Sequence, residues 1–329
     1  MPQMLVQILS ALLMAVFAGA GDALAQPAAS AYPNRPIHFI VPQTPSGLVD
    51  NVARTVAQQL SERLGQPIVV ENRAGANGAI GYVAAARAAP DGYTLLLVHQ
   101  SGLVLAVASR KNLPYDPLRD FASITNLFET SFYLVTHPSV AAHSVQELIN
   151  LAKAQPGKLN YGSVGIGSGQ HLWMERFKTL TQTNFVHVPY KGSSQASADL
   201  LAGQIQVMFQ GANFTLPQAR NGKIRILAST GTKRTQAMPS LQTVSEAGVP
   251  GFDALLWWGL SGPAGLPRPI INRLNREAGE ILRMPALREK FAESDVDLVP
   301  STPEELTERV RAEIPIFTKA MRDAGIEPE

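Results

Sequence analysis

The stretch 159-LNYGSVGIGSGQHLWMERFKTL-180 decides the fold class, because it joins a short strand directly to a helix through a glycine-rich turn. The segment 37-IHFIVPQTPSGLVDNVARTVAQQLSERL-64 has the same construction. After its turn, apolar residues recur every three and four positions, which indicates a helix with one buried face. Short β-branched runs that alternate with such helices are typical of a mostly parallel sheet covered by helices. The sequence therefore predicts an α/β fold.

Further strands and helices are predicted on both sides of these two segments. Strands are expected at 68–70, 94–98, 132–136, 185–188, 205–209 and 224–228, with helices between them, an irregular stretch around 250–251, and final helices at 270–282 and 303–324. The last helix begins with a capping box, in which Thr302 is the N-cap and Glu305 follows three residues later. We expect Pro315 to kink this helix. Because no long linker divides the chain, any two lobes must be joined by crossing strands.

The N-terminal segment predicts export. Residues 5–20 are nearly all apolar but too few for a comfortable membrane span, and Ala23 and Ala25 form the small-x-small pattern of a signal peptidase site. We therefore predict a signal peptide at residues 1–25, cleavage near Ala25 and a soluble exported protein, with a membrane anchor as the alternative. The chain has no cysteine, so it has neither disulfides nor a lipid attached through cysteine. Its formal net charge of +2 argues against a nucleic-acid partner.

Two turns present the backbone N–H groups of a helix start, at residues 41–48 and 163–170. A helix start carries about half a positive charge and several unpaired donors, so it binds a carboxylate or phosphate without arginine or lysine. Four hydroxyl groups add further donors, those of Thr44, Ser46, Ser163 and Ser168. Two such starts facing each other across a cleft would bind both ends of a dicarboxylate. The alternative is that Ser46 and Ser168 only cap their own helices.

The common catalytic motifs are absent. Gln170 stands where the dinucleotide pattern G-x-G-x-x-G needs its last glycine, and there is no P-loop. A serine-hydrolase elbow, G-x-S-x-G, needs a glycine two residues before the nucleophile. Ile166 stands two residues before Ser168, and Tyr161 two before Ser163. We therefore expect no enzymatic activity and no cofactor.

Three other features each allow two interpretations. His171 and Glu175 lie four apart on one helix face, but with no third ligand nearby we interpret them as a solvated or core pair and expect no metal. The loop 187-HVPYKG-192 combines several polar groups, and its lysine either contacts an anion or is an ordinary surface residue. Of Trp257 and Trp258, one is a candidate for the wall of a cleft, while core packing is the default for the other.

At these segments the sequence resembles the substrate-binding proteins of tripartite tricarboxylate transporters, also called Bug proteins after Bordetella uptake genes. The resemblance covers nearly all of the chain after the predicted signal peptide. Its most specific parts are 70-VENRAGANGAIG-81, 89-APDGYTLL-96, 113-LPYDP-117, 157-GKLNYGS-163, 168-SGQHL-172, 187-HVPYKG-192, and Trp257 before 262-GPAG-265.

This resemblance implies a two-lobed periplasmic binding protein of the type II-like class, whose chain crosses twice between lobes, each a mostly parallel sheet flanked by helices. It implies one lobe of residues 33–130 plus 253–329 and a second of 131–252, no enzymatic role, and a monomer that binds a small organic carboxylate for membrane permease subunits. A receptor that feeds a sensor kinase and, less favoured, an exported hydrolase remain alternatives. The expected ligand-binding residues are Gln43, Thr44, Ser46, Gly47, Asp50, Ser163, Gly165, Ser168, Tyr190, Gln210 and Trp257.

Departures from the family pattern bear on the ligand. The first loop usually reads V-P-F-A-P-G-G, so Gln43 replaces an aromatic residue and Ser46 a glycine, whereas Asp50 is retained. The family commonly has an aspartate where Gln210 stands. An amino-acid ligand needs a partner for its ammonium group, so the loss of this negative charge favours a plain or aromatic acid.

Overall fold

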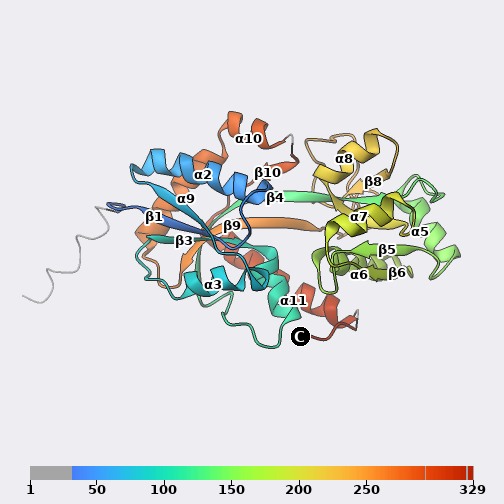
Figure 1. Cartoon of the computed structure of the whole chain (residues 1–329), viewed down its shortest axis with the longest axis horizontal. Helices are drawn as coiled ribbons and strands as arrows, with labels where there is room; N and C mark the ends of the chain where they lie inside the picture. The colour runs from blue at the N-terminus through green and yellow to red at the C-terminus, as the bar shows by residue number, and fades with distance from the viewer. Residues whose placement is uncertain (1–31, 293, 324, 329) are drawn as a thin grey trace, which may run out of the picture.

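The computed structural model describes residues 32–292, 294–323 and 325–328, so the predicted signal peptide at residues 1–25 lies outside the described residues. The chain forms two lobes side by side, with strands β4 and β9 running from one into the other (Figure 1). The strands are β1 (Ile37–Val41), β2 (Ile68–Asn72), β3 (Thr94–His99), β4 (Phe121–Thr136), β5 (Asn160–Ser163), β6 (Val186–Pro189), β7 (Val207–Gly211), β8 (Arg225–Ser229), β9 (Leu255–Pro263) and β10 (Val296–Leu298).

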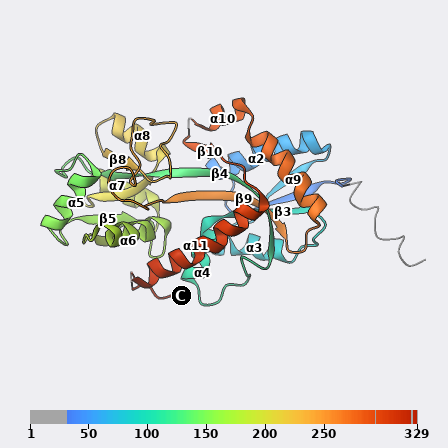
Figure 2. The same cartoon turned by 180° about the vertical axis from the view of Figure 1, so that it is seen from behind.

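Helices flank both parts of the sheet, and the C-terminal helix runs diagonally across the front of the strands toward the second lobe in the view of Figure 2. The helices are α2 (Leu48–Leu64), α3 (Ala79–Ala86), α4 (Ala106–Ser109), α5 (Val145–Ala154), α6 (Gly169–Thr181), α7 (Ser193–Leu201), α8 (Ala212–Arg220), α9 (Arg268–Leu282), α10 (Pro285–Ala292) and α11 (Pro303–Asp323), with short turns of 3-10 helix at Ala76–Gly78 and π-helix at Ser101–Leu105. None of the helices in the described part of the chain combines the length and apolar character needed to cross a membrane.

All ten strands belong to one mixed sheet, in the order β2-β1-β3-β9-β4-β7-β5-β6, with β8 and β10 also paired to β4. Pairing is parallel at the outer strands, where β1 lies between β2 and β3 and β5 lies between β6 and β7. It is antiparallel around β4 and β9. Outer parallel strands direct their carboxyl ends, and the loops that follow, to the space between the lobes.

The long strand β4 is the main link between the lobes. Its 16 residues span about 50 Å at roughly 3.3 Å per residue. Residues 121–131 pair with β9, whereas 132–136 pair with β7 and β8. The two predicted crossings are thus β4 and the segment leading into β9. The sequence indicated only the end of β4 as strand, because buried polar residues such as Thr125, Asn126 and Thr130 interrupt the apolar alternation of its first half.

Local signals elsewhere place the helices as predicted. Helix α2 buries Val52, Val56 and Leu60 and ends at Gly65, whose φ of 69° closes the helix in the left-handed region. Helix α11 starts at the predicted capping box, since the Glu305 N–H donates to Thr302 Oγ1 (3.1 Å) and the Thr302 N–H donates to Glu305 Oε2 (2.7 Å). It continues through Pro315 to Asp323 and contacts both β4 and α6. The predicted lobe limits, 33–130 plus 253–329 and 131–252, stay a prediction.

Candidate functional site

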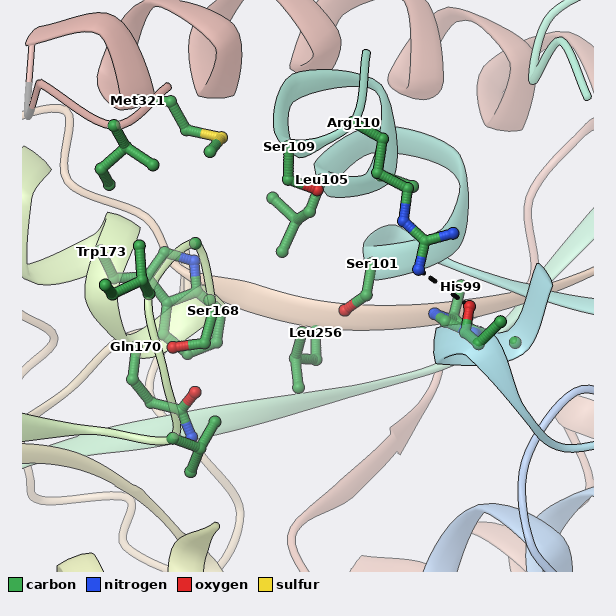
Figure 3. A pocket seen from close by; sticks show the side chains of 18 of the residues that line it. His99, Ser101, Leu105, Ser109, Arg110, Ser168, Gln170, Trp173, Leu256 and Met321 are labelled. Carbon is green, nitrogen blue, oxygen red and sulfur yellow. Dashed lines mark hydrogen bonds between the residues drawn. The ribbon is translucent and has the colours of Figure 1, made fainter. Parts of the chain in front are cut away.

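Two cavities lie between the lobes and adjoin at Gln170 and Leu256, which line both. The first cavity, about 860 Å³, lies on the side of α4 and α11. The second cavity, about 470 Å³, lies on the side of α7 and α8. Figure 3 shows the first cavity, with His99, Ser101 and Arg110 on one side, Ser168, Gln170 and Trp173 on the other, and Leu256 between them.

The turn between β5 and α6 is held in shape by its own side chains. The Ser163 hydroxyl donates to the Gly165 carbonyl (3.0 Å) and accepts from the Gly165 N–H (3.2 Å). The Ser168 hydroxyl donates to the same carbonyl (2.7 Å) and, as the N-cap of α6, accepts from the His171 N–H (3.4 Å). Both hydroxyls are therefore engaged within the protein rather than free for a ligand.

Two stacked imidazoles contact the turn between β5 and α6 and hold it through hydrogen bonds. The rings of His171 and His187 lie 3.8 Å apart between centroids, with 13° between their planes. His171 Nδ1 accepts the Gly167 N–H (3.1 Å), and His187 Nε2 lies 2.7 Å from Ser163 Oγ. Burial lowers the pKa of His171, and burial together with the neighbouring His171 lowers the pKa of His187 to about 4. Both rings are consequently neutral near pH 7, which the acceptor role of His171 Nδ1 requires.

These interactions leave the first turn of α6 available. The backbone N–H groups of Gly169 and Gln170 have no hydrogen-bond partner among residues 32–292, 294–323 and 325–328. Both residues line the first cavity. The Trp173 indole is fully buried on the same wall, and its Nε1 has no partner in the described part of the chain. This wall therefore offers neutral N–H donors together with the positive end of the α6 dipole.

The turn between β1 and α2 is held by a carboxylate instead. Asp50 Oδ2 accepts from the Ser46 N–H (3.1 Å) and from Arg54 Nε (2.9 Å), and Oδ1 accepts from Asn72 Nδ2 (2.9 Å). The Asn72 amide also donates to the Gln43 carbonyl (3.1 Å). Burial raises the pKa of the Asp50 carboxyl, but the hydrogen bonds from Arg54, Asn72 and Ser46 outweigh it and hold the pKa below its usual value. Asp50 is thus a charged anchor for the loop.

The structure divides the predicted site residues into three groups. Gln43 and Ser168 line the first cavity, and Gln210 lines the second, where its Nε2 donates to Ser197 Oγ (2.6 Å). The residues Thr44, Ser46 and Gly47 are exposed on the first loop and line neither cavity. The remaining residues lie behind the loops or in the core and also line neither cavity: Asp50, Ser163, Gly165, Tyr190 and Trp257.

The two tryptophans differ in position, and Trp257, the one expected to bind the ligand, is packed in the core. Trp257 has no exposed surface and its Nε1 donates to Glu313 Oε2 (2.9 Å), whereas Trp258 lines the second cavity. Tyr190 is also largely buried, and its hydroxyl donates to Asp199 Oδ2 (2.8 Å). The loop 187–192 thus contributes to the support of the turn through His187 more than to either cavity wall.

Sequence reasoning missed the segment after β3, which lines the first cavity through His99, Ser101, Ser109 and Arg110. The position of this segment could have been inferred, because β3 runs parallel to β1 and the carboxyl ends of parallel neighbours meet at one edge of a sheet. Residues after the predicted strand at 94–98 could therefore have been placed beside the first loop. The short π-helix that follows carries no recognisable motif.

The contact between Ser163 and His187 differs from that of an exposed nucleophile and its base. Ser163 lies beside His187 as a nucleophile lies beside its base, but Ser163 is fully buried and its hydroxyl donates to Gly165. His171 Nε2 and Glu175 Oε1 lie 3.9 Å apart. Among the residues that the structure describes, no group of three histidines or acidic residues is arranged to hold a metal ion.

Comparisons with known proteins bear on the family and the fold. The family model described as Tripartite tricarboxylate transporter family receptor matches residues 52–317. Protein BugT of Bordetella pertussis is 35% identical over 314 residues, covering 95% of this chain and 96% of that protein. A R. palustris protein solved with adipate has a TM-score of 0.75 and 32% identity, covering 91% of this chain and 100% of that one. MatC from Rhodopseudomonas palustris, with bound malate, has a TM-score of 0.69 and 30% identity, covering 88% and 99%.

Proposed function

Because the chain belongs to the tripartite tricarboxylate transporter receptor family, the periplasmic solute-binding proteins that include the Bug proteins, we propose that it binds a small organic carboxylate between its lobes without changing it. In this proposal the closed, ligand-bound form is presented to membrane permease subunits. Adipate and malate in the two related structures support a carboxylate as the ligand class.

The observation that carries the proposal is the free first turn of α6. Gly169 and Gln170, whose N–H groups have no partner in the described part of the chain, line an open cavity, and backbone donors at a helix start favour a carboxylate. The hydroxyls of Ser163 and Ser168 position this turn and do not themselves bind the ligand. Gln210 stands where the family commonly has an aspartate, and its amide makes a neutral contact to Ser197. No carboxylate is therefore present there for an ammonium group, which supports a plain or aromatic acid over an amino acid.

The free energies of hydrogen bonding and of association favour a cleft that closes around the ligand. Four charge-assisted hydrogen bonds contribute roughly 6–12 kcal/mol, whereas association itself costs about 4–15 kcal/mol. Micromolar binding, about −8 kcal/mol, therefore needs the additional apolar contact of a closed cleft. We place the rotation at residues 128–132 of β4 and at 250–256 before β9, where the chain passes between the lobes.

A pair of variants at Gly169 tests the proposal. Gly169→Ala and Gly169→Pro add the same Cβ next to Trp173, but only proline removes the backbone N–H. Proline is tolerated at the first helical position, and the extended backbone of Ser168 (φ −67°, ψ 160°) suits a residue before proline. We expect thermal-shift and calorimetric titrations with mono-, di- and aromatic carboxylates to give binding that Gly169→Ala keeps within a few fold. Gly169→Pro should weaken it roughly tenfold or more.

Equal affinity of the two variants would contradict a carboxylate at the start of α6, and absence of any carboxylate binding to the native protein would contradict the function itself. The hydrolase alternative rests on the Ser163–His187 pair, and a panel of esters and amides tests it, because turnover lost in Ser163→Ala would overturn a purely binding role. Uptake of the bound acid by a strain with and without this gene distinguishes transport from a sensory output.

A further inference from the structure

The wall of the first cavity opposite α6 carries a cation that forms no ion pair with a carboxylate of the described residues. Arg110 lines this cavity and donates from Nη2 to the Ala76 carbonyl (2.9 Å). It forms no ion pair with any residue of the described chain, whereas most of the other described arginines near the two loops, such as Arg54 and Arg73, pair with acidic side chains. A guanidinium has five N–H donors, so several of those on Arg110 remain for a ligand.

A buried imidazole beside Arg110 also lacks a partner. His99 is 7% exposed and lines the same cavity. Its Nδ1 accepts the Gly102 N–H (3.1 Å), so the proton of the neutral ring is on Nε2. This Nε2 is buried and has no hydrogen-bond partner in the described part of the chain. A buried donor without an acceptor is costly, so an acceptor group supplied by a ligand in this cavity would stabilise the imidazole N–H.

The two unpaired sets of donors lie on opposite walls of one cavity. Figure 3 shows Arg110, Ser101 and His99 facing the side of Ser168 and Gln170, with the apolar side chains of Leu105 and Leu256 between them. The lobes come close beside this cavity, since a Cβ placed on Gly167 would lie 3.8 Å from Ser109 Cβ, next to Arg110. A ligand with acidic groups at both ends and an apolar middle matches this distribution of donors and apolar surface.

We propose that Arg110 and His99 Nε2 form a second anion subsite, which makes this protein selective for a dicarboxylate with an alkyl chain between its two acidic groups. One carboxylate binds the first turn of α6, and the other binds the guanidinium and the imidazole N–H. This inference rests on the proposed function and deepens it by assigning the second acidic group. Glu327 also lines the cavity, and its negative charge opposes a dianion.

The test compares acids that differ only in the second carboxylate. Adipate and hexanoate, and in parallel succinate and butyrate, are titrated into the native protein, Arg110→Gln, Arg110→Lys and the matched control Lys111→Gln. Lys111 is exposed, so its variant removes the same charge one residue away. We expect the native protein to prefer at least one diacid over its monoacid by roughly ten- to hundredfold, the range of one charge-assisted hydrogen bond.

Arg110→Gln should remove this preference by weakening diacid binding far more than hexanoate and butyrate binding. Arg110→Lys should restore part of the preference, and Lys111→Gln should keep it. Glu327→Gln should strengthen diacid binding a few fold. A native protein that binds diacids and monoacids equally, or a preference that survives in folded Arg110→Gln, overturns the inference and leaves the proposed function intact. Failure of both kinds of acid to bind the native protein overturns the proposed function and the inference with it.

Discussion

The turn after β1 is anchored by an ionised carboxylate, Asp50, whereas the turn after β5 is supported by two neutral imidazoles, His171 and His187. The two segments look alike in sequence, since each is a strand, a turn with serine and glycine, and a helix. Their supports nevertheless differ in charge and in the pH at which they titrate. A shared pattern of backbone thus does not imply a shared chemistry of the side chains that hold it.

The largest effect is expected from removing the charged anchor. Asp50→Ala leaves the Ser46 N–H, Arg54 and Asn72 without their common acceptor. We expect the free energy of unfolding to fall by about 2–3 kcal/mol, a value that counts the Arg54 ion pair for little because Arg54 is half exposed to solvent. Urea denaturation at pH 7 measures it. Asp50→Asn, which keeps an acceptor but no charge, should lose less. If both variants unfold like the native protein, the first loop does not depend on Asp50.

A smaller effect, confined to acid, is expected at the second turn. The folded pKa of His187 is about 4 and its ordinary value is 6.5, so the unfolded chain binds its proton first as the pH falls. The contribution to stability is complete above about pH 6.5 and is lost progressively toward pH 4. The pKa of His171 is also lowered, and Glu175 and Lys178 are the other charged groups that act on this pair.

His187→Gln tests this expectation, because an amide keeps a partner for Ser163 but does not titrate. We expect its melting temperature to fall less than that of the native protein between pH 7.5 and 5. Some acid sensitivity should remain, since His99 has a pKa of about 4 in the same range. Parallel curves for the two proteins would show that the stacked pair does not determine the acid response.

The smallest effect concerns backbone strain in the first loop. Ser46 has a φ of 68°, a conformation that favours glycine, and its side chain is exposed. Ser46→Gly should therefore stabilise the fold by a few tenths to about 1 kcal/mol, measured by urea denaturation. Ser46→Ala, which retains a Cβ, is the control and should show no gain. A destabilised Ser46→Gly would indicate that the hydroxyl contributes more than the strain.

Much of the fold was predictable because its signals are local. The apolar period of α2, the capping box at Thr302 and the glycine-rich turn before α6 are each written within a few residues. The extent of β4 was not, since its polar residues are buried by pairing with strands distant in sequence. The candidate site could also be predicted only where its signals are local. Its turns were located from the sequence, but Arg110 and His99 enter the cavity only through the arrangement of β3 beside β1.

Because β4 pairs with strands of both lobes, one strand belongs to both parts of the sheet. A fragment covering only residues 131–252 would keep the last part of β4 between β7 and β8, but would cut the strand before the residues that pair with β9 and β10. The two lobes are therefore expected to be inherited, or transferred by protein engineering, only together. Ligand specificity should change by substitutions within the cleft rather than by the exchange of one lobe for another.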